Sequence, residues 1–133
     1  MDDTPALRHI LYLDDDEALV FLVRRLLQRR GYQVTAFTDQ EHAIAAVRAN
    51  PQGFDLLLTD HNMPGVSGLE VARAVLALNP ALPVALTSGY VSDELQALAL
   101  NAGVREVVYK ADAVDAFCDA VARLVRSSQR VGT

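Results

Sequence analysis

Short apolar runs that stop abruptly at polar or charged residues constrain this chain more than any other feature. The first run, His9 to Leu13 (HILYL), ends at three consecutive aspartates. Further runs lie at 32–37, 54–59, 84–87 and 105–109, and between them the apolar residues recur with the period of a helix. The sequence therefore predicts five strands that alternate with five helices.

The segment 17–30 predicts the first helix. Its apolar residues fall on one face at about 100° per residue, and Gly31 supplies a C-terminal stop. Asp16, just before the segment, is interpreted as a helix N-cap. The predicted core face consists of Leu19, Leu22, Val23, Leu26 and Leu27.

Capping residues predict where the other four helices begin. A Ser or Thr followed three residues later by Glu matches the capping box, in which each residue satisfies a backbone amide of the first turn. The candidates are Thr38 with Glu41, Ser67 with Glu70, Ser92 and Asp112, for helices over 38–49, 67–78, 92–101 and 112–126.

Alternating strands and helices with short connections predict an α/β fold. Parallel neighbours need crossover helices, and right-handed crossovers favour a doubly wound, five-stranded sheet in three layers. The flavodoxin-like order 2-1-3-4-5 is one of the two common solutions. We expect a single domain over the 133 residues, with its core at about 8–126 and a flexible tail at 127–133.

Composition excludes several classes of protein. The net charge of −5 argues against direct nucleic-acid binding, which needs clustered Lys and Arg. No apolar run approaches the ~20 residues that span a bilayer, and the first residues lack the pattern of a signal peptide. The single cysteine, Cys118, falls on the apolar face of the last helix and is predicted to be buried. We expect a cytoplasmic protein with no membrane contact.

Acidic residues follow the first and third predicted strands. In a doubly wound sheet, ligands bind outside the carboxyl ends of the strands. If the two strands are neighbours, Asp14, Asp15 and Asp60 converge there, and their like charges repel unless a cation is present. Carboxylate ligands without a nearby Cys or His cluster favour a hard ion, with Mg²⁺ the leading candidate.

The ends of the fourth and fifth strands add groups that suit phosphate. Thr87 offers a hydroxyl, and Lys110, the only lysine among twelve basic residues, offers a point charge. An aspartate beside a metal ion can attack a phosphoryl group and form an acyl phosphate. Asp60 is the candidate nucleophile.

Four motifs mark these strand ends: LDDDEAL, TDHNMPGVSGLE, LTSGY and YK. With them the sequence resembles the receiver domain of two-component response regulators, over about residues 8–126. The resemblance implies a signalling module rather than a turnover enzyme. It also implies that Asp60 accepts phosphate from a phosphohistidine on a sensor histidine kinase or a histidine phosphotransfer protein.

The same resemblance assigns the other site residues. It implies that Asp15 and Asp60 bind Mg²⁺ directly, that Asp14 does so mostly through water, and that the backbone carbonyl of Asn62 completes the protein ligands. Thr87 and Lys110 would bind the phosphoryl oxygens, and Thr87 would move on phosphorylation and shift the fourth helix.

Three positions depart from the family pattern. Ala111 follows Lys110 where proline is usual, and Val107 stands where a switch aromatic is usual, with Tyr109 next to the lysine instead. Gly89 lies two residues after Thr87, where its missing side chain is expected to leave the phosphoryl group open to water.

Two apolar residues lie off the core faces of their predicted helices. Phe21 is about 180° from the core face of the first helix, beside Arg24 and Arg25, which is typical of an interface anchor. Leu100 is similarly placed on the fourth helix. We expect Phe21 to contact the phosphate donor and Leu100 to contribute to a homodimer contact, although a lone exposed apolar residue is also ordinary.

Two alternatives stay open from the sequence. Ala111 and Val107 suit a degenerate receiver that signals without phosphate. A small aspartyl-phosphate phosphatase is the enzyme-class alternative, although the chain lacks a second acid two residues after Asp60. The chain is equally compatible with a stand-alone regulator and with a receiver of a hybrid sensor kinase.

Overall fold

The computed structural model describes residues 8–110 and 113–127. Its five parallel strands form one sheet in the order β2-β1-β3-β4-β5, which confirms the predicted α/β fold and strand order. The elements in chain order are β1 (His9–Leu13), α1 (Glu17–Arg29), β2 (Gln33–Phe37), α2 (Gln40–Ala49), β3 (Leu56–Asp60), α3 (Gly68–Leu78), β4 (Val84–Ser88), α4 (Asp93–Asn101), β5 (Glu106–Tyr109) and α5 (Val114–Arg126).

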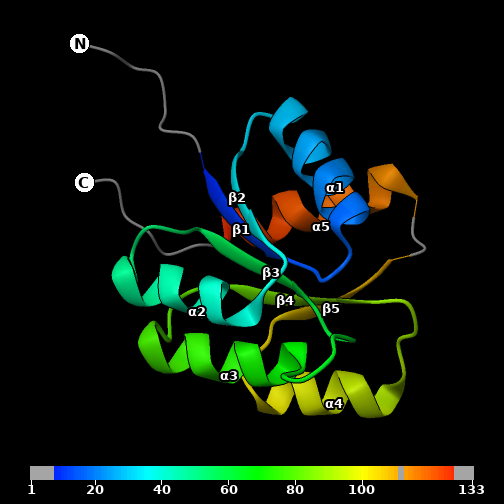
Figure 1. Cartoon of the computed structure of the whole chain (residues 1–133). Coiled ribbons are helices and arrows are strands. Elements are labelled where there is room, and N and C mark those ends of the chain that lie inside the picture. Colours follow the sequence, from blue (N-terminus) through cyan, green and yellow to red (C-terminus); the bar gives the residue numbers. More distant parts are fainter. Residues whose placement is uncertain (1–7, 111–112, 128–133) are drawn as a thin grey trace.

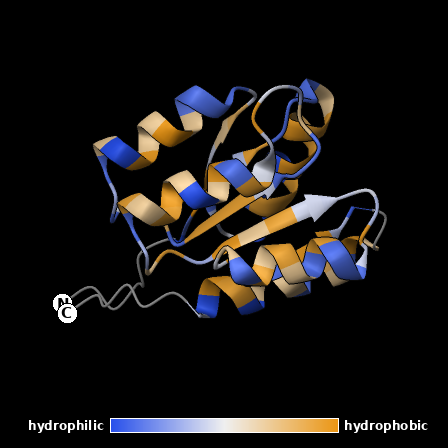
Figure 2. Cartoon of the chain, turned by 90° about the horizontal axis from the view of Figure 1, so that it is seen from below, coloured by the Kyte–Doolittle hydropathy of each residue, from blue (hydrophilic) through white to orange (hydrophobic). Residues whose placement is uncertain are grey.

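The helices form a layer on each face of the sheet (Figure 1). α1 and α5 cover one face, and α2, α3 and α4 cover the other. Because successive side chains of a strand point to opposite faces, Tyr12 and Leu58 pack toward α1 and α5 while Leu11 and Leu57 pack toward α2 and α3. Figure 2 shows the strands coloured mostly as hydrophobic and the helices as banded, as expected for a sheet buried on both faces.

The third strand differs from the prediction at both ends. It begins at Leu56, where its pairing with Ile10 of β1 starts, and it runs through Asp60. Asp60 lies within the strand because its backbone pairs with Thr87 of β4. β4 likewise extends one residue further, to Ser88, which pairs with Tyr109. Asp60 and Thr87 therefore stand at paired positions within the sheet, whereas Asp14, Asp15 and Lys110 lie just after the ends of β1 and β5.

Most predicted helix caps are confirmed. The side chains of Asp16, Ser67 and Ser92 accept hydrogen bonds from the backbone amides of their first turns. The prediction of Thr38 as the cap of α2 was wrong: Asp39 caps this helix, and its side chain accepts a hydrogen bond from the backbone amide of Glu41. A carboxylate at that end also meets the positive end of the helix dipole.

The last helix begins differently from the prediction. The cap predicted at Asp112 lies outside the described residues, and α5 starts after Ala113 with no side-chain cap. Cys118 is buried on α5 as predicted, and burial raises the pKa of its thiol above the ordinary value.

The core face of α1 is narrower than predicted. Val23 and Leu27 are buried, but Leu22 is 62% exposed. Leu22 is part of the lining of a cavity of about 200 Å³ between α1 and α5. Within the described part of the chain, no helix combines the length and hydropathy needed to cross a membrane.

Candidate functional site

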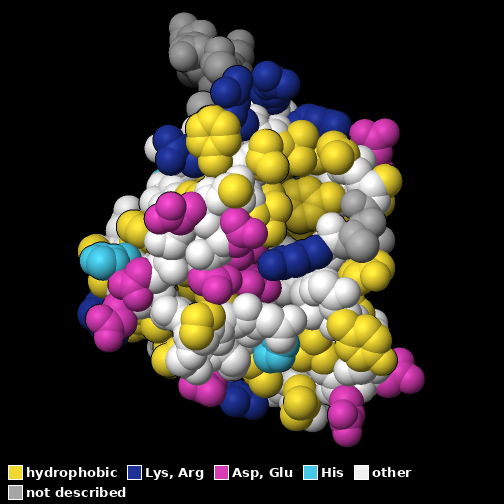
Figure 3. Space-filling view, turned by 45° about the vertical axis from the view of Figure 1, so that its right-hand side comes forward, with side chains coloured by type: hydrophobic (Ala, Val, Ile, Leu, Met, Phe, Trp, Pro, Cys, Tyr) yellow, Lys and Arg dark blue, Asp and Glu magenta, His cyan; other side chains and the backbone are white. Residues whose placement is uncertain are grey.

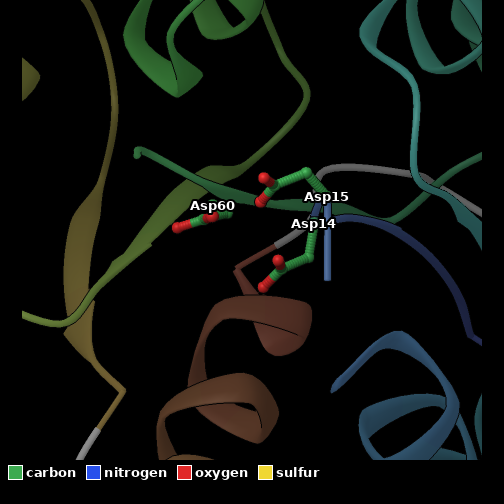
Figure 4. A group of neighbouring side chains, drawn as sticks. All are labelled: Asp14, Asp15 and Asp60. Carbon is green, nitrogen blue, oxygen red and sulfur yellow. The ribbon is translucent and has the colours of Figure 1, made fainter. Parts of the chain in front are cut away.

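Three aspartates meet where β1 and β3 end side by side (Figure 4). Leu13 pairs with Thr59, so the residues that follow these positions emerge at the same edge of the sheet. Asp14, Asp15 and Asp60 each offer a carboxylate oxygen, and these oxygens all lie within 4.8 Å of one another. The strand order thus gathers three acids from two segments.

Asp14 is fully buried and its carboxylate is fixed by three donors. Its Oδ1 accepts the backbone amide of Asp16 at 3.0 Å. Its Oδ2 accepts the hydroxyl of Tyr12 at 3.0 Å and the ammonium of Lys110 at 3.1 Å. A carboxylate held on both oxygens has a defined orientation toward the other two acids.

Asp60 is 2% exposed and is partly neutralised by Lys110. Its Oδ1 lies 3.0 Å from Nζ of Lys110 and accepts the backbone amide of Asn62 at 3.3 Å. Burial raises the pKa of Asp60 above its ordinary value, because the opposing hydrogen bond from Lys110 does not fully compensate and the charge of Asp14 adds to the rise. The ionised form of Asp60 is therefore disfavoured until further positive charge is supplied.

Lys110 bridges two of the three acids from the end of β5. Burial disfavours its charge, but hydrogen bonds to Asp60 and Asp14 outweigh that effect and raise its pKa above the ordinary value. Its side chain is 28% exposed, so the ammonium lies at the border of the site and can be reached from solvent.

Thr87 lies directly beside Asp60 on the neighbouring strand. It is 2% exposed, and its Oγ1 has no hydrogen-bond partner among the described residues. The adjacent Ser88 is satisfied locally, since its hydroxyl donates to the carbonyl of Tyr90 at 2.7 Å. A buried hydroxyl without a partner is rare in proteins, so Thr87 is suited to an incoming acceptor.

The loop after β3 is packed tightly against the site. The amide of Asn62 reaches Asp60, and its side chain lies 3.4 Å from Ser88. A Cβ at Gly68 would come within 2.2 Å of the carbonyl oxygen of Asp60, so the start of α3 can approach this strand end only without a side chain. The glycine therefore permits the close approach of α3 to the end of β3.

The three carboxylates suit a small, hard divalent cation. Three carboxylates gather beside one lysine, which pairs with two of them, so two formal negative charges stay unbalanced at the sheet edge. The exposed carboxylate of Asp15 makes no hydrogen bond within the described chain. An all-oxygen set of this kind, open on one side, suits an ion that retains several waters.

Tyr12 is a site residue that the sequence interpretation missed. It is 1% exposed, and burial together with the charge of Asp14 raises the pKa of its hydroxyl well above the usual range. The signal was available, because residues two apart in a strand share a face and Tyr12 precedes Asp14 by two.

Two predicted partner residues lie away from the acids, on opposite layers. Phe21 on α1 is 59% exposed, with the guanidinium of Arg25 at 5.6 Å from its ring centre. Leu100 on α4 is 66% exposed. Neither belongs to the acidic site, and both are available on the surface.

Figure 3 shows the face onto which the site opens. Acidic side chains gather at its centre with a basic side chain beside them, and a hollow lined with hydrophobic side chains lies directly above. The cavity between α1 and α5 includes Tyr12, Thr87 and Lys110 in its lining, so an apolar surface adjoins the acids.

Comparison with known proteins identifies relatives of the chain. The model of the response regulator receiver domain matches residues 10–122. The chain is 31% identical to the C4-dicarboxylate transport transcriptional regulatory protein DctD of Rhizobium meliloti over 91% of its length, and 35% identical to the transcriptional regulatory protein ZraR of Escherichia coli over 76%. It is also 36% identical to the two-component response regulator ARR14 of Arabidopsis thaliana over 65%. The matched regions span 24%, 22% and 23% of these three relatives, respectively.

Solved structures share the fold. A receiver domain protein of Methanospirillum hungatei superposes with a TM-score of 0.86 at 24% identity, over 94% of this chain and 98% of that one. The chemotaxis protein CheY4 of Vibrio cholerae gives 0.83 at 24% identity, over 90% and 99%. Family model, sequence relatives and fold agree, and the chain belongs to the response regulator receiver domain family, whose standard function is to accept a phosphoryl group in two-component signalling.

Proposed function

We propose that Asp60 accepts a phosphoryl group from a phosphohistidine and forms an aspartyl phosphate. One observation carries the assignment: Asp60, the unpartnered hydroxyl of Thr87 and the ammonium of Lys110 converge at one sheet edge. A nucleophile, a hydroxyl donor and a cation are the groups that transfer to a carboxylate requires.

The proposed transfer is an in-line displacement at phosphorus. A carboxylate oxygen of Asp60 forms the new O–P bond, the P–N bond of the donor breaks, and its electron pair returns to the imidazole, which takes up a proton. Lys110 holds Oδ1 of Asp60, whereas Oδ2 accepts no bond from the described residues. Asp60 thus has an oxygen available for the attack.

Thr87 and Lys110 are proposed to bind the transferred phosphoryl oxygens. Lys110 turns from the carboxylates toward the phosphoryl group, and the hydroxyl of Thr87 gains the partner it lacks. Movement of Thr87 at the end of β4 would shift the following loop and α4, which is the proposed switch between two states.

The proposed metal is Mg²⁺, held by Asp15, Asp60 and the backbone carbonyl of Asn62, and by Asp14 mostly through water. When bound, it neutralises the charge that builds up as an anionic phosphoryl group approaches three carboxylates. The convergence of the three carboxylates and the unbonded carboxylate of Asp15 support the acidic part of this ligand set.

Labelling with a small donor tests the proposal. Incubation with acetyl phosphate and Mg²⁺ should add one phosphoryl group per chain, detected by intact mass, and Asp60→Asn should abolish the labelling. Unlabelled wild-type protein would instead favour the degenerate receiver. Steady hydrolysis of many phosphate esters would favour the phosphatase.

The complete set of convergent groups supports a phosphoacceptor over the degenerate receiver, and Asn62, where a second acid would be needed two residues after Asp60, argues against the phosphatase. We further propose that this chemistry is confined to the chain's own phosphorylation and dephosphorylation. Gly89 leaves the end of β4 uncovered, since nothing lies within 4 Å of a Cβ placed there, and this supports water access to the aspartyl phosphate. The single-domain reading, with a core at about 8–126, and the cytoplasmic location stay predictions.

The α1 surface around Phe21 is proposed to contact the donor, a sensor histidine kinase or a histidine phosphotransfer protein. An exposed aromatic ring beside Arg25, next to a shallow apolar depression that includes Leu22 and Leu26, is typical of an interface anchor. A homodimer through the α4 surface with Leu100 is proposed as a separate contact.

Two phosphoryl donors, a kinase and acetyl phosphate, distinguish a role in partner docking from a role in the transfer reaction. Phe21→Ala should slow phosphotransfer from a cognate kinase while labelling by acetyl phosphate stays unchanged, because the small donor needs no protein surface. Leu100→Ala, which removes an equally exposed apolar side chain on the other layer, is the matched control. Unchanged transfer from the kinase to Phe21→Ala would remove the docking role.

A further inference from the structure

Packing in the core does not require the hydroxyl of Tyr12. Tyr12 is 1% exposed within a strand whose other buried residues, Ile10, Leu11 and Leu13, are aliphatic. A phenylalanine ring would fill the same space without a buried polar atom that needs a partner. The hydroxyl instead donates to Oδ2 of Asp14 at 3.0 Å.

Asp14 shares that oxygen between two donors of different kinds. Lys110 lies 3.1 Å from Oδ2 and 3.0 Å from Asp60, and its side chain is 28% exposed. Tyr12 is part of the sheet and is enclosed by the α1 and α5 layer. Only Lys110 of the two is free to turn toward another group.

The proposed function makes this difference matter. When Lys110 turns to the phosphoryl group, Oδ2 of Asp14 keeps only the hydroxyl of Tyr12, while Oδ1 keeps the amide of Asp16. We infer that Tyr12 is a positioning residue: its hydroxyl orients Asp14 toward the cation site while Lys110 is shared with Asp60, and it alone holds Oδ2 of Asp14 once Lys110 has turned away. This inference rests on the proposed function, since it takes Asp14 as part of the cation site.

Removal of the hydroxyl should weaken cation binding selectively. Partners that orient a metal ligand from behind typically change metal affinity by about 10–100-fold when they are lost. We expect Tyr12→Phe to raise the Kd for Mg²⁺ by about tenfold, measured by isothermal titration calorimetry on the full chain. The Mg²⁺ concentration for half-maximal labelling by acetyl phosphate should rise equally, with an unchanged rate at saturating Mg²⁺.

Tyr32→Phe is the matched control. Tyr32 precedes β2 at the opposite end of the sheet and packs against the same core layer, so the same oxygen is lost away from the acids. Its Mg²⁺ affinity should equal that of the wild type. Tyr12→Leu, which matches the aliphatic neighbours in β1, is a second variant without the hydroxyl and should show the same loss as Tyr12→Phe.

The outcomes separate this inference from the function on which it rests. Equal Mg²⁺ affinity of the wild type and both Tyr12 variants would overturn the positioning role and leave the proposed function intact. A loss of affinity in Tyr32→Phe as large as in Tyr12→Phe would also overturn it. A wild-type chain that binds no Mg²⁺ would overturn the proposed function, and the inference with it.

Discussion

The two ends of the sheet each bury an aspartate completely, but only the aspartate at the amino end has its charge balanced by partners of its own. At the amino end, Asp55 accepts the backbone amide of His9 at 2.8 Å and pairs with Arg8 at 3.2 Å. At the carboxyl end, Asp14 shares a single lysine with Asp60, and Asp15 adds a third carboxylate.

At the amino end, the polar side chains named here have hydrogen-bond partners among the described residues. The ring of His9 contacts the carbonyl of Gly53 at 3.1 Å and the hydroxyl of Thr35 at 2.7 Å, and it lies 4.6 Å from the ring of Phe54. The carboxyl end instead carries surplus negative charge and the unpartnered hydroxyl of Thr87. Burial of a carboxylate therefore does not mark a functional site by itself, whereas an unbalanced charge at a strand end does.

Loss of the amino-end carboxylate should have the largest effect on stability. Asp55→Ala leaves the buried amide of His9 and the guanidinium of Arg8 without this partner, and should lower the free energy of unfolding by about 2–4 kcal/mol. Urea denaturation measures the change. Asp15→Ala, at the exposed acid of the other end, should stay within about 0.5 kcal/mol, and an equal loss in both variants would contradict the distinction drawn between the two ends.

Mg²⁺ should stabilise only through the carboxyl end. At ten times its Kd, a ligand that binds the folded state alone adds about 1.4 kcal/mol to the free energy of unfolding. Denaturation with and without Mg²⁺ should show this gain in the wild type and in Asp55→Ala, but a reduced gain in Asp15→Asn. If the Mg²⁺-dependent gain in the free energy of unfolding were lost in Asp55→Ala, the cation would bind at the amino end of the sheet, contrary to the proposal.

Neutralising the acceptor should stabilise the chain in the absence of a cation. The raised pKa of Asp60 means that folding disfavours its ionised form, so its contribution is favourable at low pH and is lost as pH rises through the folded pKa. At neutral pH Asp60→Asn should therefore raise the free energy of unfolding. Asp55→Asn, at the other end, should lower it; the same sign for both would refute the comparison.

The smallest effect is expected at high pH. Folding raises the pKa of Lys110 above 10.5, so its ion pairs stabilise the chain fully below that value and the contribution is lost as pH rises through the folded pKa. The stability difference between wild type and Lys110→Met should stay constant from about pH 7 to 9 and shrink above about pH 10.5. A difference that already shrinks near neutral pH would show that another group titrates.

Local signals were predicted well because they depend on neighbours a few residues away. The caps at Asp16, Ser67 and Ser92 follow from short-range hydrogen bonds, and the alternation of strand and helix follows from the spacing of apolar residues. Thr38 failed as a cap because Asp39 next to it is the stronger acceptor. Leu22 failed as a core residue because helical period shows which residues share a face but not how much of that face becomes buried.

The sequence by itself determined the alternating pattern, the residue types that stop each strand and the resemblance to receiver domains. The sequence left the order 2-1-3-4-5 as one of two common solutions, and the tertiary structure decided between them. Only the tertiary structure decided that Lys110, from the end of β5, bridges two acids, and that the hydroxyl of Tyr12 contacts Asp14. The reason is physical: periodicity and capping are local, whereas contacts between strand ends depend on how the crossover helices pack, which no short stretch of sequence encodes.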